Sequence, residues 1–162
     1  MKTQVRSKHQ KNIFQQALQL SKTPIIIACF VTPIRFILEY LGLPEEAIFM
    51  IGLLWLTLGF SVYWSIKWYQ KPKFLVILLL SLCIYSPISR IPVAIAWWID
   101  VNWQLGTHYG LYFNTFGQVL LNHVFYGALV QIIPGFIIGA ITYAIMQSVK
   151  KTKNLKQQSY NG

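Results

Sequence analysis

Six polar or ionisable residues stand within, or at the ends of, otherwise apolar stretches of the chain. They are Arg35, Glu39, Arg90, Asp100, Asn122 and His123. Ionisable side chains inside a membrane are costly, usually face the protein interior, and pair with one another, so each is a functional candidate. We expect these six residues to form one polar site in the outer half of the bilayer.

Glu39 has two arginines as candidate partners. Arg35 lies four residues earlier on the same predicted helix and can pair with Glu39 along its face. The order is unfavourable, however, because the better arrangement places the acid before the base. Glu39 is then free for Arg90, and we expect an interhelical ion pair between these two residues with His123 nearby.

Arg90 lies between two prolines, Pro87 and Pro92. Each proline lacks a backbone N–H and therefore frees one carbonyl, those of Cys83 and Ile88. A guanidinium has five N–H donors and can satisfy such carbonyls together with a carboxylate. Three roles for Arg90 stay open: stabilising a kink, recognising an anion or gating from outside, and snorkelling to the outer interface.

His123 and His108 are the histidines closest to the apolar stretches. The sequence contains no His-x-x-x-His, Glu-x-x-His or Cys/His spacing, so we expect no metal and no cofactor. A hydrogen-bonded histidine at a helix end is one interpretation of His123, and proton handling with Asp100 or Glu39 is the other. No nucleophile beside a base and no catalytic pair of carboxylates can be identified, so the sequence assigns no catalytic residue and argues against an enzyme.

Small or polar residues recur every four positions late in the chain. They are Gly127, Gln131, Gly135 and Gly139. Small residues allow close helix approach in lipid, and a glutamine can hydrogen-bond across such a contact. The pattern predicts helix packing within the bundle, with homodimerisation as the alternative.

The apolar stretches that carry these residues predict an all-α integral membrane protein. The chain has 162 residues, of which 55% are hydrophobic and 11% charged, a composition that excludes an ordinary soluble domain. Four stretches reach or exceed the roughly 20 residues needed to cross the hydrocarbon. We expect four transmembrane helices in an up-down-up-down bundle, with spans at about 24–43, 46–66, 74–99 and 118–146.

The charge distribution divides the chain into three parts and predicts an orientation. Residues 1–22 form a basic segment that can fold into a short interfacial helix, residues 23–146 form the transmembrane domain, and residues 147–162 form a basic tail. Further lysines lie between the second and third stretches, while the other two connections have no cation. Cytoplasmic loops are rich in Lys and Arg, so both termini should lie on the cytoplasmic side of the cell membrane.

The formal net charge of +10 predicts a lipid surface as the partner. Cations that flank membrane spans fix topology and meet anionic headgroups, worth about 1 kcal/mol each near the surface. Basic runs are weak motifs for nucleic acid, and we expect none to bind here. A homodimer or a larger membrane complex would add a protein partner.

Three functions are compatible with these residues. The first is a small transport, channel or solute-binding protein with an outward-facing polar site. The alternative is an accessory or assembly subunit of a larger membrane complex, and the third is a membrane-embedded enzyme. A transporter should be stabilised by its solute, whereas an accessory subunit should co-purify with its partner in a fixed ratio.

Overall fold

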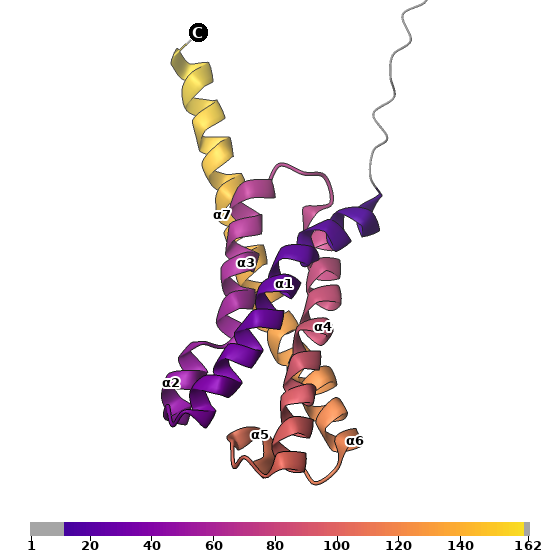
Figure 1. Cartoon of the computed structure of the whole chain (residues 1–162). Helices are drawn as coiled ribbons and strands as arrows, with labels where there is room; N and C mark the ends of the chain where they lie inside the picture. Colours follow the sequence, from indigo (N-terminus) through magenta and orange to yellow (C-terminus); the bar gives the residue numbers. More distant parts are fainter. Residues whose placement is uncertain (1–11, 161–162) are drawn as a thin grey trace, which may run out of the picture.

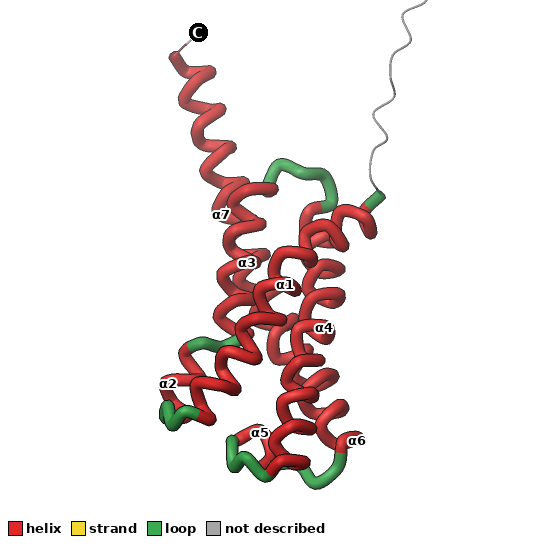
Figure 2. Tube along the Cα trace, viewed as in Figure 1, coloured by secondary structure: helices red, strands yellow, loops and turns green. Residues whose placement is uncertain are grey.

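A computed structural model describes residues 12–160, and these residues are helical apart from short connections (Figures 1 and 2). The described part contains no strand, so the all-helical prediction is confirmed. The elements are α1 (Ile13–Tyr40), α2 (Glu45–Met50), α3 (Leu53–Trp68), α4 (Phe74–Trp103), α5 (His108–Leu111), α6 (Phe116–Val119), the π-helix η1 (Leu120–Tyr126) and α7 (Gly127–Tyr160).

Four helical stretches are long and apolar enough to cross a membrane, as predicted. Each is longer than the expected span, although the first ends at Tyr40 and not at residue 43. The stretches are Ile13–Tyr40, Glu46–Trp68, Phe74–Trp103 and Phe116–Lys153.

The first helix begins earlier than expected. Asn12 caps α1 by accepting a hydrogen bond from the backbone N–H of Gln15 at 2.8 Å, and the Gln15 side chain accepts one from the backbone N–H of Asn12. Residues 13–22 are therefore the first turns of α1, while residues 1–11, the rest of the predicted basic segment, lie outside the described part. Ala17 and Leu20 from these turns are buried, which explains why the helix continues here.

The second and fourth spans differ from uninterrupted helices. Between α2 and α3 the backbone of Gly52 is extended, with φ −94° and ψ 148°, and glycine is unfavourable inside a helix. The fourth span contains the π-helix η1 ahead of α7, and Pro134 lies within α7. Residues 147–160 of the basic tail continue α7.

The helices pack mainly in three pairs, α1 with α4, α3 with α7, and α4 with α7. The α3–α4 connection lies at one end of the molecule, where the C-terminal part of α7 also projects (Figure 1). Helices α2, α5 and α6 lie at the opposite end, which we call the α5 end. Large apolar side chains on the outside, including Phe30, Trp55, Ile91 and Ile133, are exposed, as suits a lipid environment.

Two clusters of buried apolar side chains hold the bundle together. The cluster nearer the α5 end includes Leu53, Tyr85, Val93, Trp97 and Tyr109. The other cluster joins the first turns of α1 to α3 and α4, and includes Ala17, Trp64, Phe74, Leu78 and Leu82. The polar residues considered below lie mainly in the half of the bundle that contains the first cluster.

Candidate functional site

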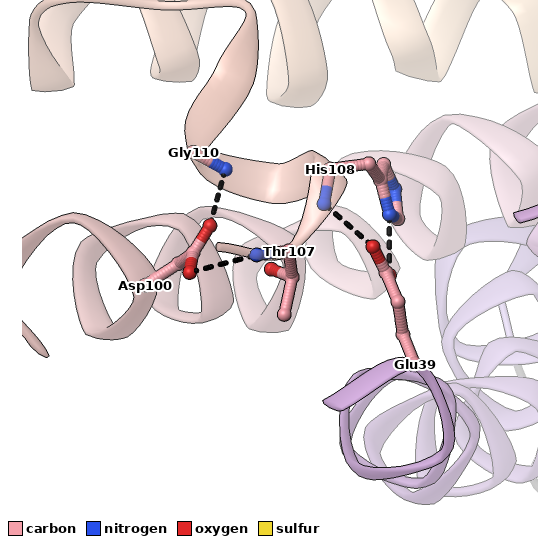
Figure 3. Close-up of polar contacts among 5 residues, drawn as sticks. All are labelled: Glu39, Asp100, Thr107, His108 and Gly110. Carbon is pink, nitrogen blue, oxygen red and sulfur yellow. Dashed lines mark hydrogen bonds and ion pairs between the residues drawn. The ribbon is translucent and has the colours of Figure 1, made fainter. Parts of the chain in front are cut away.

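Glu39, near the end of α1, is bound by a residue from the connection between α4 and α6. The backbone N–H of His108 donates to Glu39 Oε1 at 2.5 Å, and His108 Nδ1 lies 2.5 Å from Glu39 Oε2 (Figure 3). A carboxylate only accepts hydrogen bonds, so the Nδ1 atom carries the proton that joins the two side chains. Both side chains are largely buried, with 15% of His108 and 12% of Glu39 exposed.

Asp100 organises the same connection from the end of α4. Its Oδ1 accepts the backbone N–H of Thr107 at 3.1 Å, and its Oδ2 accepts that of Gly110 at 2.7 Å (Figure 3). A β-carbon at Gly110 would lie 2.5 Å from Asp100 Oδ2, so the carboxylate requires glycine at this position. The negative charge of Asp100 is thus used to fold the loop that presents His108.

The Glu39 pairing differs from our expectation. Within the described residues, no ion pair or hydrogen bond joins Glu39 to Arg90 or to Arg35. His108 takes both carboxylate oxygens from the start of the short helix α5. Helical periodicity cannot reveal this contact, since α5 has only four residues and the sequence does not fix the path of the connection that holds it. The one signal available was the presence of a histidine between two glycines, Gly106 and Gly110.

Arg35 and Arg90 therefore have no acidic partner among the described side chains. Arg35 is 9% exposed, and its charge interacts repulsively with that of Arg90 from the facing helix α4. No hydrogen bond from either guanidinium to a described residue is formed, and the Nε atoms of both are buried without an acceptor. No hydrogen bond joins Arg90 to the carbonyls freed by Pro87 and Pro92, the contact on which the kink-stabilising role, one of the three left open, would depend.

Gly127 of α7 makes room for Arg90. A β-carbon at this position would lie 2.9 Å from Arg90 Nη1 and 3.0 Å from its Cζ. The guanidinium therefore lies directly against the α7 backbone. A side chain at position 127 would collide with it, so glycine is needed there for a reason other than helix–helix contact.

Tyr109 places a buried hydroxyl beside Arg35. The side chain is 2% exposed, its ring lies 5.6 Å from that of Phe36, and its hydroxyl has no hydrogen-bond partner in the described structure. Burial raises the pKa of Tyr109; the charge of Arg35 opposes this effect, and that of Glu39 adds to it. The phenol is therefore a neutral group that can donate a hydrogen bond to an anion.

Asn122 and His123 lie in η1, where the backbone N–H of Gly127 bonds to the carbonyl of Asn122, five residues earlier. Single π-turns inside α-helices are frequent at functional sites. The Asn122 side chain bonds to the Gln118 carbonyl of its own helix at 2.8 Å and is not joined to the arginines. His123 packs edge-on against Phe113, with ring centroids 5.1 Å apart, and is close enough to interact electrostatically with Arg90 and His108.

Further buried polar groups continue from Arg90 towards the middle of the bundle. Tyr85 interacts electrostatically with Arg90, and its hydroxyl oxygen lies 3.4 Å from Thr57 Oγ1. Ser89 Oγ lies 3.3 Å from Gln131 Oε1, and Gln131 Nε2 is buried without an acceptor. These residues come from α3, α4 and α7, so the polar interior is shared by three helices.

Gly135 and Gly139 lie against α3 and α4 of the same chain. A β-carbon at Gly135 would lie 2.9 Å from Thr57 Cγ2, and one at Gly139 would lie 2.6 Å from Leu78 Cδ2. The Gly139 carbonyl also accepts a hydrogen bond from Ser65 at 2.8 Å. This face of α7 is therefore occupied within one protomer.

The structure places Arg90 close enough to Arg35 and to His123 for their charges to interact. Glu39 and Asp100 instead bind the α4–α6 connection. No group of three His, Cys, Asp or Glu side chains within residues 12–160 is arranged to hold a metal ion. The cluster is instead rich in hydrogen-bond donors: two guanidinium groups and the Tyr109 hydroxyl.

No protein-family model, curated protein or solved structure matches this chain.

Proposed function

We propose that this chain is a membrane-embedded solute-binding or transport protein whose polar site lies in the half of the bundle that contains α5. The observation that carries the proposal is a set of buried polar atoms to which the described protein offers no partner. In the membrane-spanning helices they are Thr32 Oγ1, Arg35 Nε, Ser61 Oγ, Ser86 Oγ, Arg90 Nε and Gln131 Nε2.

Each unpaired buried group costs about 1–3 kcal/mol. A bundle selected only for stability would carry apolar side chains at such positions, because lipid tails already solvate its exterior. Polar residues inside membrane spans generally line pathways for solutes, ions or protons. These atoms come from α1, α3, α4 and α7, which supports a solute site shared by all four spans.

The orientation belongs to the same proposal. The helices cross the cell membrane in alternate directions, with both termini in the cytoplasm and the α5 end facing outwards. The lysines support this arrangement: Lys67, Lys71 and Lys73 flank the α3–α4 turn, and the end of α7 is also lysine-rich. Lys71 Nζ lies 3.7 Å from the centre of the Trp68 ring, an aromatic and basic pairing that suits a headgroup layer near anionic lipids.

The test is flux through proteoliposomes that contain the purified protein. Vesicles are exposed to osmotic gradients of small neutral, cationic and anionic solutes, and their volume change is followed by light scattering. We expect faster permeation of at least one solute class than in empty vesicles. Equal permeation of every class, together with recovery of the protein in a fixed ratio with another subunit, would establish the accessory role instead.

A matched pair of threonines makes the test specific. Thr32 is fully buried and its hydroxyl has no partner, whereas the Thr142 hydroxyl donates to the Ile138 carbonyl of its own helix at 2.8 Å. Thr32→Val should preserve or raise the Tm and lower the flux several-fold. Thr142→Val makes the same chemical change and should leave the flux near that of the parent.

A further inference from the structure

We infer that the site binds an oxyanion, a phosphate, sulfate or carboxylate group, between Arg35 and Arg90. This inference rests on the proposed function and assigns its ligand class. Two guanidinium groups from facing helices repel each other, and one of them is more than nine-tenths buried. An anion between them would neutralise both charges.

The acidic side chains that the structure describes do not supply that anion. The chain has four acidic residues, and Glu39 is held by His108 while Asp100 is held by two backbone N–H groups. Glu45 and Glu46 lie at the start of α2, and no ion pair links Glu46 to either arginine. An uncompensated buried charge is strongly destabilising, and two such charges of one sign point to a bound counter-charge.

The donors around the arginines suit an oxyanion better than a halide. Guanidinium forks bind carboxylate and phosphate oxygens in pairs of parallel hydrogen bonds. The buried Tyr109 hydroxyl, which interacts electrostatically with Arg35, supplies a further donor. Gly127 keeps the neighbouring α7 backbone clear of side-chain atoms beside the Arg90 guanidinium.

A free solute and a lipid headgroup could each supply this chemistry. An apolar groove runs along the same two helices, lined by Cys29, Pro33 and Ile37 from α1 and by Pro92, Ile95 and Ile99 from α4. The phosphate of a lipid whose acyl chain lies along these helices is therefore the second source of the ligand.

The experiment measures thermal unfolding of the purified protein in an uncharged detergent. Sodium phosphate, sulfate and acetate are titrated against sodium chloride at constant ionic strength, and the series is repeated in nanodiscs of phosphatidylcholine with and without phosphatidylglycerol. We expect saturable stabilisation by at least one oxyanion, with the Tm rising by about 5–10 °C at 100 times the Kd. Stabilisation by phosphatidylglycerol alone would assign the site to a lipid phosphate.

Variants connect the shift to the two arginines. Arg35→Gln and Arg90→Gln should abolish it, and without anion each should melt at or above the parent temperature because the repulsion is removed. Arg90→Lys keeps the charge but loses the fork, and should weaken binding about 10-fold, the loss of one strong hydrogen bond. Lys151→Gln removes an equal charge from the exposed end of α7 and should retain the full shift.

The inference is overturned if no oxyanion or anionic lipid shifts the Tm saturably, or if the shift survives in Arg35→Gln and Arg90→Gln. Should Arg90→Gln not fold, Arg35→Gln and Arg90→Lys decide the matter. Flux of a neutral or cationic solute without any anion effect would overturn the oxyanion assignment and leave the transport function standing.

Discussion

Glu39 and His108 are 69 residues apart in sequence, yet both oxygens of the Glu39 carboxylate are bound by the backbone and ring nitrogens of His108. The contact ties the end of α1 to α5, and through Asp100 it is connected to the end of α4. It also removes from the bundle interior an acid that could otherwise neutralise Arg35 or Arg90. The pair thus holds the α4–α6 connection and leaves the arginines without an acidic partner among the described side chains.

The Glu39–His108 contact predicts strong energetic coupling. In a double-mutant cycle of Glu39→Ala and His108→Ala, we expect a coupling of about 1.5–3 kcal/mol, the range for hydrogen bonds to charged groups. The exposed pair Lys67 and Tyr63, whose polar atoms are 2.8 Å apart, is the control and should couple by less than about 1 kcal/mol. Reversible unfolding in detergent gives these values, and additive effects at Glu39 and His108 would contradict the structure.

The close packing of α7 predicts opposite effects of one substitution at two glycines. Gly139→Ala places a β-carbon 2.6 Å from the fully buried Leu78 and should destabilise the bundle by about 1–3 kcal/mol. Gly59→Ala meets nothing within 4 Å and should be neutral or stabilising by up to about 1 kcal/mol. Denaturation of both variants in the same detergent checks this; equal stability would show that α7 does not pack in this register.

Tyr109 predicts a loss of stability at alkaline pH. Burial, the largest cause, raises its pKa in the folded protein, so the folded state retains the proton after the unfolded phenol, with a pKa of about 10, has lost it. This contribution to stability is complete below pH ~10 and declines as the pH rises from there towards the folded pKa. Tyr109→Phe should flatten the alkaline decline in Tm, while Tyr112→Phe, at an exposed site, should not.

The proposed orientation predicts labelling from one side. In a background without Cys29 and Cys83, a cysteine replacing Asn102 should react with a membrane-impermeant maleimide added to intact cells. A cysteine replacing Gln70, in the α3–α4 turn, should react after the membrane is opened. The reverse pattern would place the lysine-rich end outside. The proposed site between Arg35 and Arg90 would then be reached from the cytoplasmic side.

The four spans could be predicted because long apolar runs determine membrane helices with little dependence on tertiary structure. Their ends could not, as α1 shows: Ala17 and Leu20 extend the helix because α3 and α4 bury them. Gln15 and Asn12 form the capping box S/T/N-x-x-Q at that point, a local signal that was present in the sequence.

The polar site was only partly predictable for a different reason. Hydropathy shows that Arg35, Glu39 and Arg90 are costly where they stand, but it does not say which of them meet. That depends on side-chain direction and on the path of residues 104–115, where Gln104 adopts φ 50° at the end of α4. The partner of Glu39 is therefore a residue at the start of the short helix α5, and the arginines have no acidic partner among the described side chains.

The π-turn at Leu120–Tyr126 also affects how the fourth span can change in length. A turn closed over five residues instead of four takes up about one residue more than an α-helix needs. Deleting one residue there would close the turn to α-helical geometry and keep Gly127, Gly135 and Gly139 in register with their neighbours. The same deletion within α7 would rotate the side chains on one side of it by about 100° relative to those on the other. A single-residue deletion should therefore be tolerated in η1 and rejected one turn further along.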